Sequence, residues 1–277
     1  GDLTFTLEGH GDIDPPGKDD AWELVRGRTE ISLAGAWQQA ERLQLDSFSA
    51  KGETLSLAAA GSLEPKPGTL ALTLNMAAGE SVFLAELLGV DRLGPAAAEL
   101  AVTGNLARPE AAISLQVDGI AAPEFTAAAL NVTGRVSAGA GLFGPAPRLE
   151  LDLAGRIGNP QLVGVAEVNA VLGDSLPWIL RGNLDLTGLA LAVAALEAAV
   201  ESARLTASGP FDLASGAATL QAGLAVDDLT KLQPLTGISL GGKIDLAGPV
   251  DLKGYGSSIH GDLKGRWDQP TSDIELL

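Results

Sequence analysis

Apolar and polar residues alternate along most of this chain, and a glycine recurs within the apolar row. One copy of the pattern is Leu100, Val102, Gly104 and Leu106, and a second has Gly35 two residues before Trp37. A period of two is typical of β-strands, whose successive side chains point to opposite faces of a sheet. The pattern therefore predicts strands with one apolar face, and the glycine falls on that face in each copy.

Glycine in the middle of a strand weakens it and marks a bulge, a bend or a close approach of another backbone. When such glycines repeat at matching heights, they curve a sheet. We expect the sheet to curve at Gly35, Gly61, Gly104, Gly134, Gly155, Gly188, Gly209 and Gly248. Gly182 fits the same spacing but lies nearer to a predicted turn.

Three short segments interrupt the alternation and predict helical turns. Segment 81–88 begins with a serine that can cap a helix, and segment 174–180 begins with Asp174 and places Pro177 in its first turn. The third starts at Asp228. The stretch 189–200 is so rich in alanine that helix and strand both fit it. Strands are predicted near 3–7, 24–34, 43–49, 53–63, 69–76, 97–106, 111–117, 127–137, 148–157, 161–171, 182–193, 200–213, 217–226, 240–253 and 258–267.

Amphipathic helices long enough to cover so many strands are missing from the sequence. The fold class expected is therefore all-β, an elongated, strongly curved and repetitive antiparallel sheet that forms a trough, with short helical turns inserted. We interpret residues 1–277 as one continuous segment of a longer protein. A strand, helical turn and strand recur at roughly 53–137 and 201–267, which indicates an internal repeat.

The apolar face of such a sheet is either filled by its own side chains or left open as a groove, and the pattern alone does not decide between these. Leucine, valine and alanine fill a wide trough poorly, and aromatic residues are only 4% of the chain. If the trough is open, the candidates for its lining are apolar residues near the glycines. They are Leu100, Val102, Leu106, Val132, Leu151, Leu153, Ile157, Leu246 and Val250.

Charge and composition restrict the possible partners. The formal net charge is −17, with 18 basic and 35 acidic residues and no basic cluster, which disfavours nucleic acid as a partner. Mean hydropathy is nevertheless positive at +0.22, so we expect the charges to lie on one face. The chain has no cysteine, which excludes disulfides and thiol chemistry.

Residues suited to catalysis are scarce. His10 and His260 each stand alone in a glycine-rich stretch of sequence. The sequence contains no phosphate-binding P-loop motif and no dinucleotide-binding motif that is followed by a predicted helix. We therefore predict that the chain is not an enzyme and needs no cofactor. One acidic loop, with Asp12, Asp14, Asp20 and Glu23, matches the spacing of an EF-hand calcium loop, but Pro16 and Asp19 at other loop positions favour a plain acidic loop without metal.

Several stretches of the chain resemble the AsmA-like superfamily of bacterial envelope proteins, and within it the TamB family. They are Leu-Thr-Ala-Ser-Gly-Pro-Phe-Asp-Leu at 205–213, residues 228–237 with the glycine-rich strand 240–248, and the opening strand 3–13. The resemblance covers nearly the whole chain, and it rests on patterns of residue type rather than on invariant chemistry.

The resemblance implies a β-rich trough, called a β-taco, in the periplasm of a Gram-negative bacterium, in a protein anchored to the inner membrane. It implies that the apolar groove carries phospholipid acyl chains between the inner and outer membranes. It also implies an outer-membrane barrel protein as a partner, bound through parts outside this segment. The alternative is a structural or chaperone scaffold that assists the assembly of barrel proteins or autotransporters by strand addition.

Overall fold

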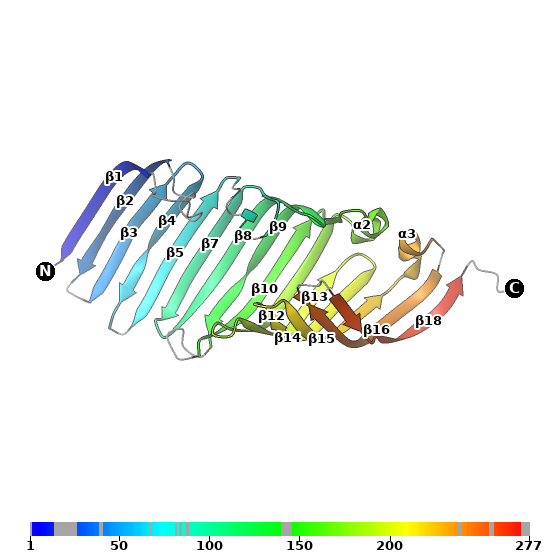
Figure 1. Ribbon diagram of the computed structural model, residues 1–277. Coiled ribbons are helices and arrows are strands. Elements are labelled where there is room, and N and C mark those ends of the chain that lie inside the picture. The colour runs from blue at the N-terminus through cyan, green and yellow to red at the C-terminus, as the bar shows by residue number, and fades with distance from the viewer. Residues whose placement is uncertain are drawn as a thin grey trace. The chain divides into compact units, whose positions relative to one another are not determined.

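The computed structural model describes residues 2–13, 27–38, 41–66, 68–80, 82, 85–86, 89–139, 146–237, 240–254 and 258–272. The fold is all-β, with antiparallel strands and short helical segments between some of them, as the sequence predicts (Figure 1). The chain divides into two compact units. Unit 1 comprises residues 1–123 and 128–143, and unit 2 comprises residues 124–127 and 144–277.

Unit 1 is an antiparallel sheet in which each long strand pairs with the next along the chain, except that β5 pairs with β7 past the short β6. A helical segment that includes Val82, Ala85 and Glu86 follows β5, so the helical turn expected at 81–88 is confirmed at its described residues. The strands are β1 (Leu3–Ile13), β2 (Gly27–Gln38), β3 (Arg42–Lys51), β4 (Leu55–Glu64), β5 (Thr69–Ala78), β6 (Arg92–Leu93), β7 (Ala96–Asn105), β8 (Arg108–Ala122) and most of β9 (Phe125–Ala138).

Unit 2 repeats this plan, with β10 paired to β12 and the later strands paired in sequence up to β16, which pairs with both β17 and β18. Its elements are β10 (Arg148–Gly158), β11 (Gln161–Leu162), α2 (Ala166–Leu172), β12 (Ser175–Asp185), β13 (Ala190–Ala199), β14 (Ala203–Asp212), β15 (Ala217–Val226), the 3-10 helix η2 (Leu229–Leu232), α3 (Gln233–Thr236), β16 (Leu240–Lys253), β17 (Ser258–Gly261) and β18 (Lys264–Ser272).

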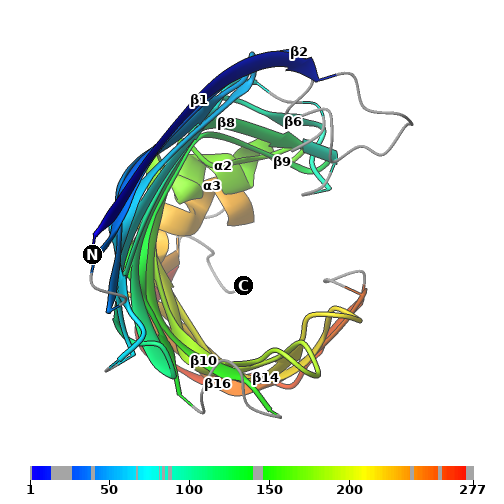
Figure 2. The ribbon, with the colours of Figure 1, turned by 90° about the vertical axis from the view of Figure 1, so that its left-hand side faces the viewer.

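Both sheets are curved. Figure 2 looks along the stack of strands and shows the strands of each unit bending in one direction, so each sheet has an inner, hollow face (Figure 2). In unit 2, α2 and α3 lie on the inner side of the curve. The predicted curvature is therefore present in each unit.

The local predictions around α2 were wrong. Segment 174–180 was expected to be helical, but residues from Ser175 onward form β12, and the helix occupies 166–172, where a strand was expected. Pro177 is tolerated in β12 because it lies opposite Arg156 of β10 but beyond the end of the pairing with β13. A proline at that place removes no ladder hydrogen bond on the β13 side.

The strand expected at 182–193 is also wrong, because a turn at 186–189 divides it between β12 and β13. The alanine-rich stretch that fitted helix and strand equally is the strand β13. The helical turn after Asp228 is confirmed, since η2 and α3 follow it and the Asp228 carboxylate accepts a hydrogen bond from the backbone N–H of Thr230.

Buried side chains are few in the part of the chain that the structure describes. In unit 1, Ala85, Leu93 and Val117 form a small buried cluster, against which Leu115 and Leu130 pack. In unit 2, Val226 and Leu229 are buried where η2 meets the sheet. Most apolar strand residues instead keep part of their surface exposed. The inner faces of the sheets are therefore candidate binding surfaces.

Candidate functional site

The apolar face of unit 1 is made of rungs, by which we mean sets of residues that lie directly opposite one another on neighbouring strands. In two adjacent rungs, each position from β1 to β8 is an apolar residue or glycine. The Leu100 rung is Leu7, Leu33, Phe48, Ala59, Leu74, Leu100 and Ile113. The Val102 rung is Phe5, Gly35, Leu45, Gly61, Leu72, Val102 and Ala111.

Unit 2 is built in the same way. The Leu149 rung is Leu149, Leu184, Leu191, Phe211, Ala218, Leu252 and Ile259. The Leu151 rung is Leu151, Gly182, Val193 and Gly209. The Leu153 rung is Leu153, Leu180, Leu196, Ala207, Ala222 and Gly248, and the Leu246 rung is Gly155, Trp178, Ala198, Leu205, Leu224, Leu246 and Gly265.

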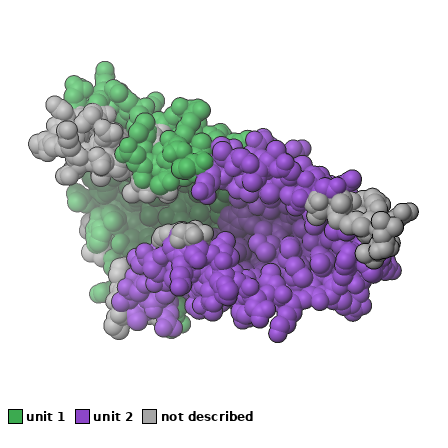
Figure 3. Space-filling model, turned by 45° about the vertical axis from the view of Figure 1, so that its right-hand side comes forward, with its two compact units in different colours: residues 1–123, 128–143 green, residues 124–127, 144–277 purple. Residues whose placement is uncertain are grey.

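Many of the rung residues are neither buried nor fully exposed. Along β10, residues of the apolar row such as Leu151 and Leu153 are half-buried, while Glu150 and Asp152 between them are exposed. Leu100, Val102, Leu246 and other rung residues have the same intermediate burial. The space-filling view shows unit 2 hollowed between two rims (Figure 3). A row of side chains that touches neighbours and still meets solvent is the surface expected of an open apolar groove.

Glycines in two of the rungs coincide with irregularities of strand pairing. The register shifts at Gly35 and opposite Gly61 in the Val102 rung, and at Gly182 and next to Gly209 in the Leu151 rung. A Cβ atom added at Gly61 would collide with the carbonyl oxygen of Ala71. Bulges bend the strand that carries them, so these rungs are where the sheets acquire curvature.

Phe5 fills the notch at Gly35. The Phe5 ring lies so close over this glycine that a Cβ there would meet its Cζ atom at 2.6 Å. An aromatic ring across a glycine replaces the side-chain contacts that the glycine lacks. In this rung, therefore, the glycine creates the bend and its cross-strand neighbour covers the exposed backbone.

Most of the predicted lining residues lie on the apolar faces, but not all. Leu106 is in the turn between β7 and β8 rather than in a rung. Val132 is half-buried on β9, Ile157 pairs with Leu176, and Val250 pairs with Leu220. Leu100, Val102 and Val132 belong to unit 1, and the other rung residues predicted belong to unit 2.

The glycine predictions need two corrections. Gly188 lies in the turn between β12 and β13 and has open space around it, so it does not bend a strand. Gly182, which the sequence placed nearer a turn, is instead in the middle of β12 at a bulge. Gly104 lies one residue before the end of β7 and has a φ of 103°, and Gly134 and Gly155 lie within β9 and β10.

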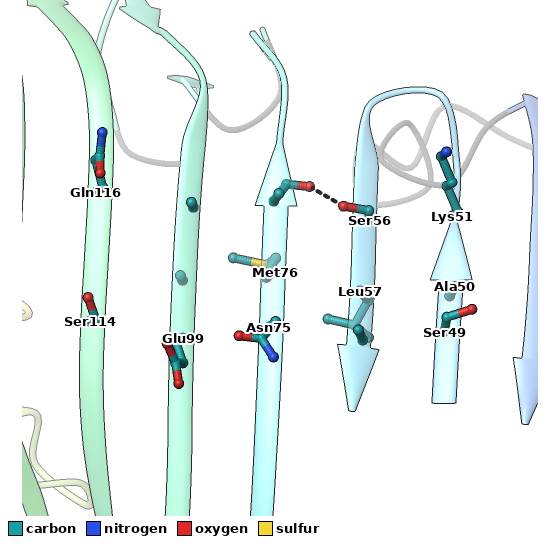
Figure 4. Close-up of a pocket in the computed structure, with 14 residues that line it drawn as sticks. Ser49, Ala50, Lys51, Ser56, Leu57, Asn75, Met76, Glu99, Ser114 and Gln116 are labelled. Carbon is teal, nitrogen blue, oxygen red and sulfur yellow. Dashed lines mark hydrogen bonds between the residues drawn. The ribbon is translucent and has the colours of Figure 1, made fainter. Parts of the chain in front are cut away.

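The opposite face of unit 1 carries a shallow depression of about 510 Å³ that contains none of the predicted lining residues. Its floor consists of polar rungs in which Ser49, Asn75, Glu99 and Ser114 follow one another across the strands, separated by Ala58 (Figure 4). Ser56 donates a hydrogen bond of 3.3 Å to the carbonyl oxygen of Ala77 there. Short side chains account for the hollow, and its lining contains one carboxylate, Glu99, and one amine, Lys51, without a histidine or a second carboxylate.

Three aspartates in unit 2 have a lowered pKa because each accepts hydrogen bonds, Asp185 and Asp212 in turns and Asp228 at the start of η2. The Ser215 hydroxyl and nearby backbone N–H groups lower the pKa of Asp212, and the backbone N–H groups of Thr187 and Gly188 lower that of Asp185. The Thr230 hydroxyl lowers the pKa of Asp228. A carboxylate held in its charged form in this way is a structural acceptor, unlike the raised pKa of a general acid.

Metal ligands do not gather in the described ranges, where no group of three or more His, Asp or Glu side chains could hold a metal ion. Of the acidic loop singled out in the sequence, Asp12 is exposed on β1, and Asp14, Asp20 and Glu23 lie outside the described residues. His10 and His260 are both exposed on strands.

Within the described residues, no helix has the length and apolar character needed to cross a membrane. No family model, curated protein or solved structure matches the chain. The proposals that follow therefore rest on the geometry of the two sheets and on the resemblance stated from the sequence.

Proposed function

We propose that the apolar inner faces of this protein form a groove that holds the acyl chains of phospholipids. The observation that carries this proposal is the composition of the rungs: across neighbouring strands they contain only apolar residues and glycine, and they remain partly exposed. An apolar face of this size costs free energy when it meets water, at roughly 25 cal/mol per Å². An acyl chain laid on it removes apolar surface of both partners from water.

The size of the faces suits an acyl chain. Strands lie about 4.8 Å apart, so the Leu100 rung extends roughly 30 Å from β1 to β8. A single leaflet of a bilayer has a hydrocarbon depth of about 15 Å, half of the whole core. The Leu100 rung is therefore longer than one acyl chain, and adjacent rungs offer further parallel tracks.

We extend the proposal to the cellular setting through the resemblance to the AsmA-like superfamily. On this proposal the chain is a periplasmic segment of a protein that bridges the inner and outer membranes, and phospholipid moves along its groove. An outer-membrane barrel protein is the proposed partner of other parts of the protein. No step of this function needs a cofactor, a nucleic acid or an enzymatic reaction.

The experiment places a charge in the groove of each unit. Val102→Asp and Leu246→Asp put a carboxylate in a rung, whereas the matched controls Thr103→Asp and Ala247→Asp put it on the opposite, exposed face of the same strand. Circular dichroism measures folding, and photo-crosslinking to phospholipid in the full-length protein measures lipid capture. Because the rungs keep contact with water, we expect all four variants to fold.

The expected result is at least a tenfold loss of lipid capture in the two rung variants, since a hydrated carboxylate interrupts the apolar track, and no loss in the controls. Unfolding of the rung variants alone would identify these residues as ordinary packed core. A folded rung variant that captures lipid as well as its control would refute the groove.

A further inference from the structure

The two helical segments on the inner side of unit 2 are held very differently. The segment formed by η2 and α3 is anchored, because Leu229 is buried and Asp228 caps the helix through Thr230. Lys231 adds an ion pair to Glu201, with 2.9 Å between Nζ and Oε1. Helix α2 has no buried residue and no side-chain hydrogen bond at its N-cap.

In the described part of the chain, the Asn169 side chain forms two hydrogen bonds that hold α2. The Asn169 carboxamide oxygen accepts a hydrogen bond of 2.7 Å from the backbone N–H of Leu162, and its amide nitrogen donates one of 2.9 Å to the Leu162 carbonyl oxygen. Leu162 belongs to β11, which pairs with Phe125 and Thr126. Asn169 therefore fastens the helix to the sheet as a neighbouring strand would, through two parallel bonds.

Glycines in the left-handed backbone region flank α2 on both sides. Gly164 has a φ of 82° and Gly173 a φ of 67°, and neither has an atom within 4 Å of the place where a Cβ would stand. Such residues absorb large changes of backbone angle at little cost. Exposed apolar side chains at this edge include Val163 and Val165, which are 60% and 37% exposed, and Leu235 of the neighbouring α3, which is 43% exposed.

We propose that residues 163–173, with α2 at their centre, form a hinged flap at the rim of the unit 2 groove, latched by Asn169. When the latch opens, the flap swings on Gly164 and Gly173 and uncovers the rim end of the apolar rungs. The rung at that end is Ile157 with Leu176, next to the loop that carries α2. This inference rests on the proposed groove and adds a controlled lateral entrance for an acyl chain.

The test measures access to the groove without any lipid. The chain has no cysteine, so a single introduced thiol is the only reactive one. Leu176→Cys places it at the rim beside the flap, and Leu184→Cys places it on the same face of β12 but about 26 Å farther along the strand. The rate of modification by a bulky apolar maleimide is compared with and without Asn169→Ala, in the full chain.

We expect Asn169→Ala to raise the modification rate of Leu176→Cys about tenfold, because two hydrogen bonds that close the flap are lost, and to leave Leu184→Cys unchanged. The matched control Asn183→Ala removes an exposed asparagine from the outer face of β12 and should change neither rate. An unchanged rate at Leu176→Cys overturns the flap. An equal rise at both thiols also overturns it, because it would mark general loosening of the sheet.

Lipid capture by the same variants separates this inference from the proposed function. If the groove binds lipid, Asn169→Ala should accelerate photo-crosslinking without changing the amount captured at equilibrium. If no variant captures lipid while the thiol at position 176 becomes more accessible, the lipid function fails and the flap stands. If the wild-type chain captures lipid but Asn169→Ala changes neither rate, the flap fails and the groove stands.

Discussion

Units 1 and 2 each have an apolar inner face, and the two faces differ in the helical segments that lie on them. Both sheets contain a rung in which large residues and glycines alternate, with Gly35 and Gly61 in unit 1 and Gly182 and Gly209 in unit 2. In unit 1 the helical segment buries Ala85 in a cluster with Leu93 and Val117. In unit 2, α2 buries nothing.

This comparison separates two features of the molecule. The curvature of the sheets is the same kind of feature in both units, whereas the packing of the helical segments differs between them. The glycine rungs set curvature through backbone geometry, so they recur in both units. The helical insertions sit at the rim and can be core, as around Ala85, or loosely attached, as at α2. A function that depends on movement is expected from a loosely attached helical segment such as α2.

The largest effect we predict comes from filling the glycine notches. Gly61→Val in unit 1 and Gly209→Val in unit 2 each place a Cβ against a backbone carbonyl oxygen of the next strand, that of Ala71 or Thr219. Gly209 also has a φ of 138°, which a β-branched residue does not adopt readily. We expect each change to lower the free energy of unfolding by about 3 kcal/mol.

Chemical denaturation checks this, with amide exchange reporting which unit loses protection. Gly9→Val on β1 is the control, because nothing lies within 4 Å of the added Cβ. If both units lose protection equally after Gly61→Val, the curvature of the two sheets is not set separately, and the comparison above breaks down.

A smaller effect should distinguish the two kinds of helical insertion. Val117→Ala removes two methyl groups from the buried cluster of unit 1 and should cost about 2 kcal/mol. Val168→Ala, in the half-buried middle of α2, should cost less than about 0.5 kcal/mol. Equal losses measured by urea denaturation would show that α2 is packed as firmly as the helical segment of unit 1.

The smallest effect concerns the turns and their response to pH. Unit 2 closes two hairpins with Asp185 and Asp212, whereas Asn105 closes the β7–β8 turn of unit 1 by accepting a 2.8 Å bond from the backbone N–H of Ala107. The pKa of each aspartate lies below 3.8 in the fold. Their stabilisation is therefore present above pH 3.8 and is lost as the pH falls through the folded pKa values.

Amide proton shifts of Thr187 and Ala214 should consequently titrate with midpoints below pH 3.8, while the shift of Ala107 stays constant. Asp185→Asn and Asp212→Asn should abolish the titrations. Midpoints above 3.8 would contradict the assignment of these carboxylates as hydrogen-bonded turn acceptors.

Strands in which apolar and polar residues alternate around a glycine could be predicted from the sequence. It predicted the apolar rows along the strands that contain Leu100, Val102 and Leu246, because the alternation of apolar and polar residues is visible within each strand. It did not distinguish Gly182 from Gly188, since the spacing is the same in a strand and in a turn that follows one. Only the pairing of β12 with both neighbours decides that Gly182 lies at a bulge.

The region 161–180 was mistaken for a related reason. Asp174 and Pro177 are typical of a helix start, yet pairing with β10 along the whole of β12 outweighs that local preference. The signal for α2 was Asn169, whose side chain completes the hydrogen bonds of Leu162, but a single asparagine has no recognisable pattern in a sequence. The latch and the flap could therefore be found only in three dimensions.

The uniform rungs also set the energy landscape for anything that travels on them. A guest that shifts by one strand along the Leu100 or Val102 rung, about 4.8 Å, meets another apolar residue or glycine and no charged or hydrogen-bonding side chain. The free energy of the guest therefore changes little with its position along the rung. Its movement within one unit is one-dimensional diffusion with no preferred binding position. Such a track has no built-in direction, and any net flow along it must be imposed at the places where cargo enters and leaves.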